Sequence, residues 1–264
     1  MISPALKVFH GIALLAVSAS MACAPLPAEP GTASEAGPCA KFKKENELHA
    51  CFKREYTAAD HTLNAVYKKI QSSIHADLRG DLRDNSREWI RMKEYNCGFQ
   101  VEMLQDATED RKRAEFYQCA LGYTVSRTAY IRKAFGRQGV SAALAGDYDD
   151  GFSGNLELRK TPGEKNSFDF KIEVVRGPTY HLGEINGRVV FENGATGVYE
   201  ERPNCSGVKE AAFAPDSESN EPCCRLDFQL RERQGFRTIE VKETDCGYFH
   251  GARAYFDGLY RKIK

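Results

Sequence analysis

Two spacings of apolar residues divide the chain into a first, helical half and a second, strand-forming half. Between residues 48 and 134, apolar side chains recur every three or four positions, which is the period of an amphipathic helix. After Gly139 the period becomes two, most cleanly in 155–159 (NLELR) and 168–174 (FDFKIEV). The pattern therefore predicts an α+β protein of two domains, with the helices first.

Three helices are predicted in the first half. The first stripe runs from residue 48 to 74, the second helix begins near Asp81, and Gly136 and Gly139 close the third. Short turns between them indicate a compact antiparallel bundle. The residues expected to face its interior are Phe52, Tyr56, Ala59, Leu63, Val66, Ile70, Ile74, Leu82, Trp89, Ile90, Cys97, Phe116, Ala120, Tyr123, Tyr130 and Ala134.

The second half predicts six to eight short antiparallel strands. Besides the two clean runs, less regular strand-like segments occupy 187–192, 197–201, 224–230 and 238–241. Turn-forming pairs separate the segments, which favours a small antiparallel β-barrel or sandwich. Those pairs are Pro162-Gly163, Gly177-Pro178, Asn186-Gly187, Asn193-Gly194 and Gln234-Gly235.

The first 24 residues are typical of an export signal. Lys7 precedes a short apolar run at 11–19, and Ala22-Cys23-Ala24 offers a small-residue cleavage site. Two fates of Cys23 stay open: removal with the signal, or lipidation as in bacterial lipoproteins, although Ser20 stands where such sites usually have leucine. The Pro-, Ala- and Gly-rich stretch 25–38 is expected to be a disordered linker.

Cysteine usage supports export independently. Eight cysteines follow Cys23, four before residue 120 and four after residue 204, as expected for two disulfide-bonded domains. No C-x-x-C pair occurs, which argues against zinc. Three connectivities are open in the first set, whereas strand alternation predicts Cys224–Cys246 in the core and Cys205–Cys223 over a mobile loop at 206–222. The eight are Cys39, Cys51, Cys97, Cys119, Cys205, Cys223, Cys224 and Cys246.

Charge and hydropathy exclude several classes of protein. The 37 basic and 37 acidic residues balance, which argues against binding to nucleic acid or a polybasic mode of membrane binding. No run of about 18 apolar residues occurs, so no transmembrane helix is expected.

One set of spaced residues resembles a known family. The pattern C-x7-A-D-x2-L-N-x-V-Y from Cys51 to Tyr67, W-x7-C from Trp89 to Cys97, and C-x4-T-x2-R from Cys119 to Arg127 resemble the LprI-type lysozyme inhibitors. Ser86 replaces the family's usual glutamine, and Lys93-Glu94 its usual Arg-Asp pair. The resemblance covers roughly 39–135 and, together with the period change, places a helical domain at 39–138 and a β domain at 145–264. The ending from Cys246 to Tyr260 resembles, more loosely, secreted β domains fused to LprI-like modules.

A short polar set within these motifs is not explained by helix packing. Asp60 and Asn64 are four residues apart, and Thr124 and Arg127 are three apart, so each pair can share a helical face. We expect structural hydrogen bonds first, with Arg127 pairing with a carboxylate such as Asp60. The same four residues are also the candidate partner surface. Trp89 is expected to be a core anchor.

No catalytic, cofactor or metal site is predicted, and the protein is not expected to be an enzyme. No Ser or Cys nucleophile stands in a recognisable elbow. His250 before glycine is expected to be a hydrogen-bonded turn residue. The DYDDG stretch at 147–151 fails the calcium-loop pattern and predicts a solvated turn between the domains.

The resemblance implies an exported envelope protein of the lysozyme-inhibitor type, located in the periplasm or outer envelope of a bacterium and protecting peptidoglycan. Its partner would then be a lysozyme or another envelope protein. The alternative is a general envelope module whose barrel binds a protein or a small ligand in its mouth. Inhibition of lysozyme by the purified chain discriminates between them.

Overall fold

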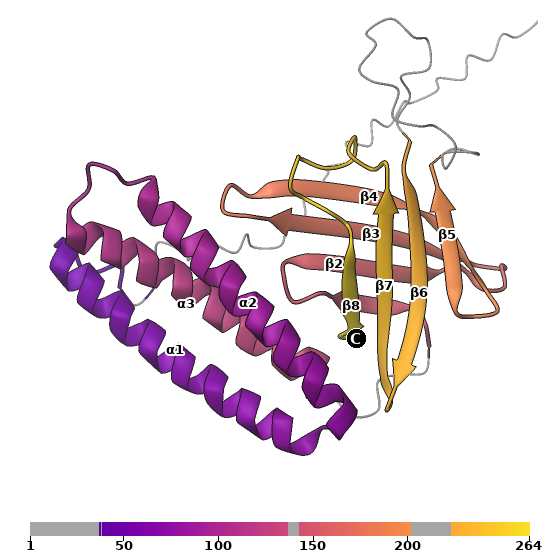
Figure 1. Ribbon diagram of the computed structural model, residues 1–264, viewed down its shortest axis with the longest axis horizontal. Helices are drawn as coiled ribbons and strands as arrows, with labels where there is room; N and C mark the ends of the chain where they lie inside the picture. The colour runs from indigo at the N-terminus through magenta and orange to yellow at the C-terminus, as the bar shows by residue number, and fades with distance from the viewer. Residues whose placement is uncertain (1–36, 38, 137–142, 202–222) are drawn as a thin grey trace, which may run out of the picture.

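The computed structural model describes residue 37 and residues 39–136, 143–201 and 223–264 (Figure 1). Within these ranges it shows a bundle of long helices beside an antiparallel β-barrel, which confirms the predicted two-domain α+β fold. The expected signal peptide at 1–24, the linker at 25–38 apart from Gly37, and the loop at 206–222 lie outside the described residues.

The bundle contains α1 (Glu45–Ser73), α2 (Ala76–Glu102) and α3 (Glu109–Ala134). The Thr108 hydroxyl caps α3 by accepting a hydrogen bond from the Arg111 amide at 3.1 Å, and acidic residues occupy the first turn. α2 begins five residues before the predicted start near Asp81 and continues through Gly80 and Gly98. Both glycines face open space, so they weaken the helix modestly without interrupting it.

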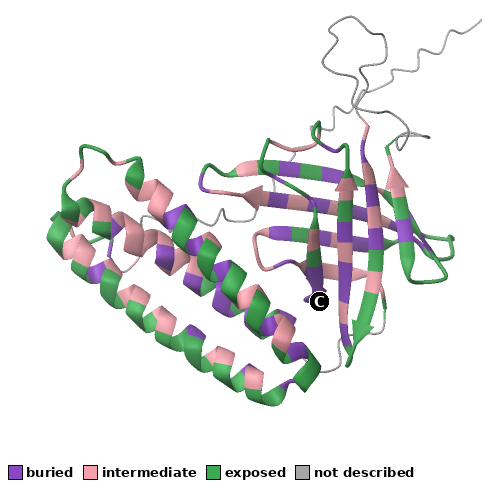
Figure 2. Cartoon of the chain, in the orientation of Figure 1, coloured by how far each residue is buried: buried purple, intermediate pink, exposed green. Residues whose placement is uncertain are grey.

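The third helix packs against both of the others, whereas α1 and α2 make few direct contacts. Figure 2 shows the resulting division of each helix into a buried and an exposed side. Ile90 was predicted to face inward, but 43% of it is exposed, because the adjacent Trp89 takes the inward position on α2. The described apolar cluster of the bundle comprises Leu63, Ile70, Ile74, Leu78, Leu82, Trp89, Tyr130, Ile131, Ala134 and Phe135.

Two disulfides fasten the bundle. Cys39–Cys51 ties the segment before α1 to that helix, and Cys97–Cys119 joins α2 to α3. The sequence left three connectivities open, and the helix arrangement selects this one.

The barrel is a meander of eight antiparallel strands in which each strand pairs with the next and β1 also pairs with β8, closing the barrel. The six predicted strand segments correspond to β2 to β7. The two further strands escaped prediction because one is short and rich in aspartate and the other carries two cations. The strands are β1 (Gly146–Asp149), β2 (Gly154–Lys160), β3 (Ser167–Arg176), β4 (His181–Glu192), β5 (Thr196–Glu200), β6 (Arg225–Arg233), β7 (Phe236–Thr244) and β8 (Gly258–Lys262).

The predicted turn at Asn186-Gly187 is wrong, because both residues lie inside β4. Gly187 stands opposite Phe170, and a Cβ built on it would lie 2.3 Å from a ring carbon of Tyr199. This glycine therefore makes room for a neighbouring ring instead of forming a turn.

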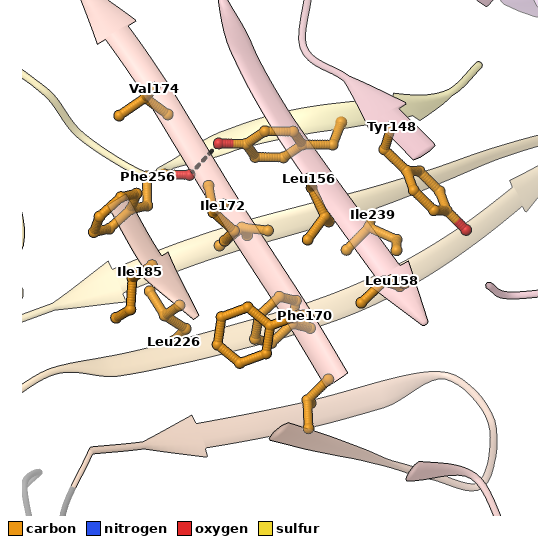
Figure 3. Packing of buried hydrophobic residues seen from close by; sticks show 14 of the residues in the cluster. Tyr148, Leu156, Leu158, Phe170, Ile172, Val174, Ile185, Leu226, Ile239 and Phe256 are labelled. Atoms are coloured by element: carbon orange, nitrogen blue, oxygen red, sulfur yellow. Dashed lines mark hydrogen bonds between the residues drawn. The ribbon is translucent and has the colours of Figure 1, made fainter. Parts of the chain in front are cut away.

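Inward-facing side chains from all eight strands fill the barrel (Figure 3). Phe228 lies 5.2 Å from Phe170 between ring centroids, and the hydroxyl of Tyr260 donates to the carbonyl oxygen of Phe256 at 2.9 Å. The Cys224–Cys246 disulfide belongs to this core, as the alternation predicted. Cys223 is disulfide-bonded as well, and its predicted partner Cys205 lies outside the described residues.

The two domains share an apolar interface. Phe236 and Ile263 of the barrel region pack into the helical cluster. The guanidinium of Arg261 lies 4.6 Å from the ring centroid of Phe135 and donates to Asp81 of α2 at 3.4 Å. The barrel is thus fixed against the helices through α2 and the end of α3.

None of the described helices combines the length and apolarity that crossing a bilayer requires.

Candidate partner-binding groove

A groove of about 260 Å³ runs between α1 and α2, with α3 beneath it. It exists because α3 separates the other two helices along part of their length. Its lining combines apolar, amide, hydroxyl and cationic groups and contains no carboxylate. The lining residues are Leu63, Asn64, Tyr67, Arg83, Ser86, Arg87, Trp89, Ile90, Arg127 and Ile131.

Trp89 and Arg127 form a cation–π pair in the interior beneath the groove. The guanidinium carbon of Arg127 lies 5.5 Å from the Trp89 ring centroid and 5.0 Å from that of Tyr130. Only 2% of Arg127 and 5% of Trp89 are exposed. Aromatic faces carry partial negative charge, so they stabilise a cation that has lost its hydration.

Arg127 is bonded to α2 and not to the residue predicted. Its Nη2 donates to Asn85 Oδ1 at 2.8 Å and to Ser86 Oγ at 3.1 Å. The predicted pair with Asp60 is wrong, because Asp60 accepts a hydrogen bond from Asn64, four residues along α1, at 2.9 Å. Arg127 therefore pins α3 to α2.

Two nitrogens of Arg127, Nε and Nη1, are buried and make no hydrogen bond to the part of the chain that the structure describes. Burial lowers the pKa of Arg127 to about 10, so it stays cationic at neutral pH. Burial and the neighbouring Asp150 raise the pKa of Asp149 to about 6. Arg127 and Asp149 lie close enough to attract each other electrostatically across the domain junction.

The rim of the groove carries exposed charge. Arg83 and Arg87 of α2 contact the carboxylate of Asp84 at 3.4 Å and 3.7 Å. These distances exceed those of strong charge-assisted hydrogen bonds. Asn64 projects from α1 on the opposite side.

The structure separates the four residues of the predicted partner surface. Asn64 and Arg127 line the groove, and Asp60 lies behind Asn64. Thr124 is fully buried and donates to the Ala120 carbonyl oxygen of its own helix at 2.7 Å. Thr124 therefore acts within the bundle.

Comparison with known proteins gives a family match for the helical domain. Residues 39–131 match the family model of lysozyme inhibitor LprI. The match spans the described helices up to Ile131 of α3 and confirms the resemblance for the helical domain. The searches of curated proteins and of solved structures found no match.

The LprI positions converge on the interior of the bundle. Trp89 is buried as predicted, and Cys97 and Cys119 bond to each other. Ser86, which stands where LprI proteins usually have glutamine, accepts from Arg127. Lys93 donates to the Tyr56 hydroxyl at 3.1 Å and lies 5.4 Å from the Trp89 centroid, so it ties α2 to α1. LprI is a family of inhibitors, not of enzymes. The disulfides of the chain itself indicate an exported protein.

The acidic stretch at 147–151 is less solvated than predicted. The Asp150 carboxylate is buried, accepts from the amides of Phe152 and Gly154 at 2.7 Å and 2.9 Å, and pairs with Arg176. It shapes the turn between β1 and β2 beside the helices. Among the described residues, no group of three or more His, Cys, Asp or Glu side chains could hold a metal ion.

His250 is held as a structural residue. Its Nδ1 lies 2.9 Å from the Gly251 carbonyl oxygen, and its Nε2 lies 3.0 Å from the Glu243 carboxylate. Glu243 also accepts from the Phe256 amide at 2.7 Å. These contacts fix the segment that leads into β8.

Sequence reasoning missed Arg83 and Arg87 of the α2 wall of the groove, and it noted Ser86 only as a departure from the family motif. Together with Ile90 they are spaced i, i+3, i+4 and i+7, which places them on one helical face. A search for apolar stripes passes over this face because most of its members are polar. The same spacing, applied to the polar side chains Arg83, Ser86 and Arg87, would have found it.

Proposed function

We propose that the protein is an exported binding protein of the cell envelope that inhibits lysozyme and so protects peptidoglycan. The observation that carries the proposal is the LprI match over 39–131. The groove supports it, since a solvent-open recess with a stacked arginine beneath it is more than a minimal helix bundle requires.

A cell-wall clearing assay tests the proposal. The mature chain, with its disulfides intact, is added in micromolar excess to hen-type and bacterial lysozymes, and the initial rate of turbidity loss is followed. We expect the rate to fall about tenfold or more at saturating inhibitor, as tight occupancy of the enzyme predicts. An undiminished rate with every muramidase tested, from protein that circular dichroism shows to be folded, would contradict inhibition.

One observation favours a second candidate, a general protein-binding module. The barrel lies outside the matched residues, and it exposes large apolar side chains at Leu182 (64%) and Tyr248 (76%). Side chains fill the described interior of the barrel, which favours a protein partner on its outside over a small ligand within it. Binding of an envelope protein without inhibition of any lysozyme would select this candidate.

We further propose a periplasmic or outer-envelope location, reached through the signal at 1–24. Mass spectrometry of the exported protein distinguishes the two fates of Cys23. A diacyl or triacyl adduct on Cys23 identifies a lipid anchor, and an unmodified chain starting at or beyond Pro25 identifies simple cleavage.

A further inference from the structure

We infer that the groove between α1 and α2 receives an acidic side chain of a protein partner, with its carboxylate between Arg83 and Arg87 and its aliphatic part over Trp89. The inference rests on the proposed function for the identity of the partner. The chemistry of the groove is independent of it.

The size of the groove sets the scale of its occupant. Its volume of about 260 Å³ lies below the range of roughly 300–1,000 Å³ usual for pockets that hold drug-sized ligands. One acidic side chain fits that space, and its flanking residues then lie on the rim. A projecting residue of a protein partner is therefore the appropriate occupant.

The charges around the groove favour a carboxylate. Three arginines line it and no carboxylate does; Asp84 and Asp60 are not among the lining residues, and Asp149 acts on Arg127 from the domain junction. Asp84 holds Arg83 and Arg87 only at 3.4 Å and 3.7 Å, and Asp60 accepts from Asn64. A partner carboxylate placed between the two rim arginines can form shorter, charge-assisted bonds to both, which offsets the loss of the Asp84 contacts.

Arg127 supplies a fixed positive charge beneath this position. Its guanidinium is held by the stack with Trp89 and Tyr130 and by Asn85 and Ser86, so little reorganisation is needed when an anion arrives. With two nitrogens unpartnered among the described residues, much of its charge is not compensated by hydrogen bonds. Burial in a medium of low dielectric strengthens its attraction for an anion in the groove.

The apolar part of the lining contacts the methylene groups of the acidic side chain and an apolar residue next to it. Leu63, Trp89 and Ile131 are buried, and Ile90 is 43% exposed beside them. An acidic residue with an apolar neighbour covers Ile90 and buries its own methylene groups. Specificity then comes from charge, and part of the affinity from apolar area.

Trp89 provides the readout, because it is the only tryptophan of the chain and lines the groove. The probe is the capped peptide acetyl-Leu-Glu-Leu-amide, titrated into the full mature chain while tryptophan fluorescence is recorded. We expect a saturable change, and binding about fivefold or more weaker for the isosteric acetyl-Leu-Gln-Leu-amide. Equal binding of both peptides, or no saturable change with either, would overturn the inference.

Variants locate the site. Arg83→Gln with Arg87→Gln should weaken the glutamate peptide about five- to tenfold, since two exposed charge contacts are removed. Arg113→Gln with Arg253→Gln is the matched control, because it changes the net charge equally at exposed arginines outside the groove lining, and it should bind as the parent does. Ser86→Gln fills the groove without changing charge, keeps an acceptor for Arg127, and should also weaken the peptide. Equal effects of the test and control pairs would contradict a groove site.

The same variants in the clearing assay separate this inference from the proposed function. If the parent chain inhibits a lysozyme and the Arg83/Arg87 variant inhibits it equally well, the groove inference fails and the function stands. If the parent inhibits none but the glutamate peptide binds with the variant pattern above, the function fails and the groove stands as an acidic side-chain site for another protein. Loss of inhibition in the groove variants alone supports both.

Discussion

The interiors of the helical bundle and the barrel differ in chemistry. In the described barrel the inward-facing cluster is apolar and aromatic, and the buried polar residues of this region are not members of that cluster; they are Asp150, Thr161, Ser167, Thr238, Arg261 and Lys262. The bundle instead buries several polar side chains, namely Lys93, Asn96, Thr124, Arg127 and Thr128.

This difference suggests separate roles for the two domains: the barrel provides stability and the bundle provides a binding surface. Burial of a cation is costly unless aromatic faces and hydrogen bonds replace its water. In the bundle, Lys93 and Arg127 each make a cation–π contact with Trp89, and two disulfides reinforce the small apolar core. The barrel contributes apolar burial, and the bundle contributes a charged recess.

The largest expected effect lies in the barrel core. Phe228→Ala removes a ring that is 1% exposed and packs against Phe170 and Phe191. The free energy of unfolding should fall by about 3–5 kcal/mol, because the ring's transfer energy is lost and a cavity remains. Urea unfolding followed by far-ultraviolet circular dichroism measures it, with the exposed Val198→Ala as control. A loss below about 1 kcal/mol would mean that the barrel is not the densely packed region.

The disulfides test the comparison at equal loop length. Cys97–Cys119 and Cys224–Cys246 each span 22 residues, so loop entropy predicts about 3 kcal/mol for either one. Replacing the first pair by serine should shift the transition reported by Trp89 fluorescence, since α2 and α3 lose their covalent link. Replacing the second should shift barrel unfolding and leave a cooperative transition, because the apolar core persists. If the barrel lost its cooperative transition after the second replacement and the bundle kept its transition after the first, the barrel would not be the domain with the larger apolar core.

The junction between the domains should respond to pH through Asp149. Its pKa of about 6 lies above the ordinary value near 4 of an unfolded aspartate, so the folded protein binds this proton more tightly. The stability that this group contributes is therefore full at low pH and falls as pH rises from about 4 to 6. Burial and, to a smaller extent, Asp150 disfavour the charged carboxylate, and Lys133 and Arg127 partly offset this. Asp149→Asn should raise stability at pH 7 by about 1–2 kcal/mol, a value reduced from the full shift because the side chain is half-buried.

Chemical unfolding at pH 4.5 and pH 7 checks this prediction. The stability difference between Asp149→Asn and the parent should shrink at the lower pH, whereas the exposed Asp106→Asn should match the parent at both. A gain from Asp149→Asn that is larger at the acidic pH would reverse the sign and refute the assignment.

The smallest expected effect concerns Thr124. Thr124→Val keeps the shape of the side chain but loses the hydrogen bond to the Ala120 carbonyl, and it should cost about 1 kcal/mol or less. Binding of the glutamate peptide should be unchanged, because Thr124 does not line the groove. Weaker peptide binding at unchanged stability would return Thr124 to the partner surface.

Much of the architecture was predictable because it depends on local periodicity. The stripe ending at Ile74 and the alternation at 168–174 each predict which side chains turn inward, and the structure buries Leu63, Ile70 and Ile74 of the stripe and the apolar residues of 168–174. Alternation also placed Cys224 in the core opposite Cys246. The errors at Ile90 and Gly187 have another cause: in each, a large ring from elsewhere, Trp89 or Tyr199, decided the environment.

Half of the candidate site could be predicted. Asn64 and Arg127 stood out as polar motif residues and do line the groove. Arg83 and Arg87 did not stand out, because exposed arginines are common on helix surfaces. Only the position of α1 opposite them makes them line a groove.

The sequence alone determined the two periods, the cysteine sets and the LprI motif, since each depends on spacing along the chain. Only the tertiary structure decided that α3 separates α1 from α2, that Arg127 bonds to Asn85 and Ser86 instead of Asp60, and that β1 meets β8. These are contacts between residues distant in sequence, and they depend on side-chain volume and burial in three dimensions, which local spacing does not encode.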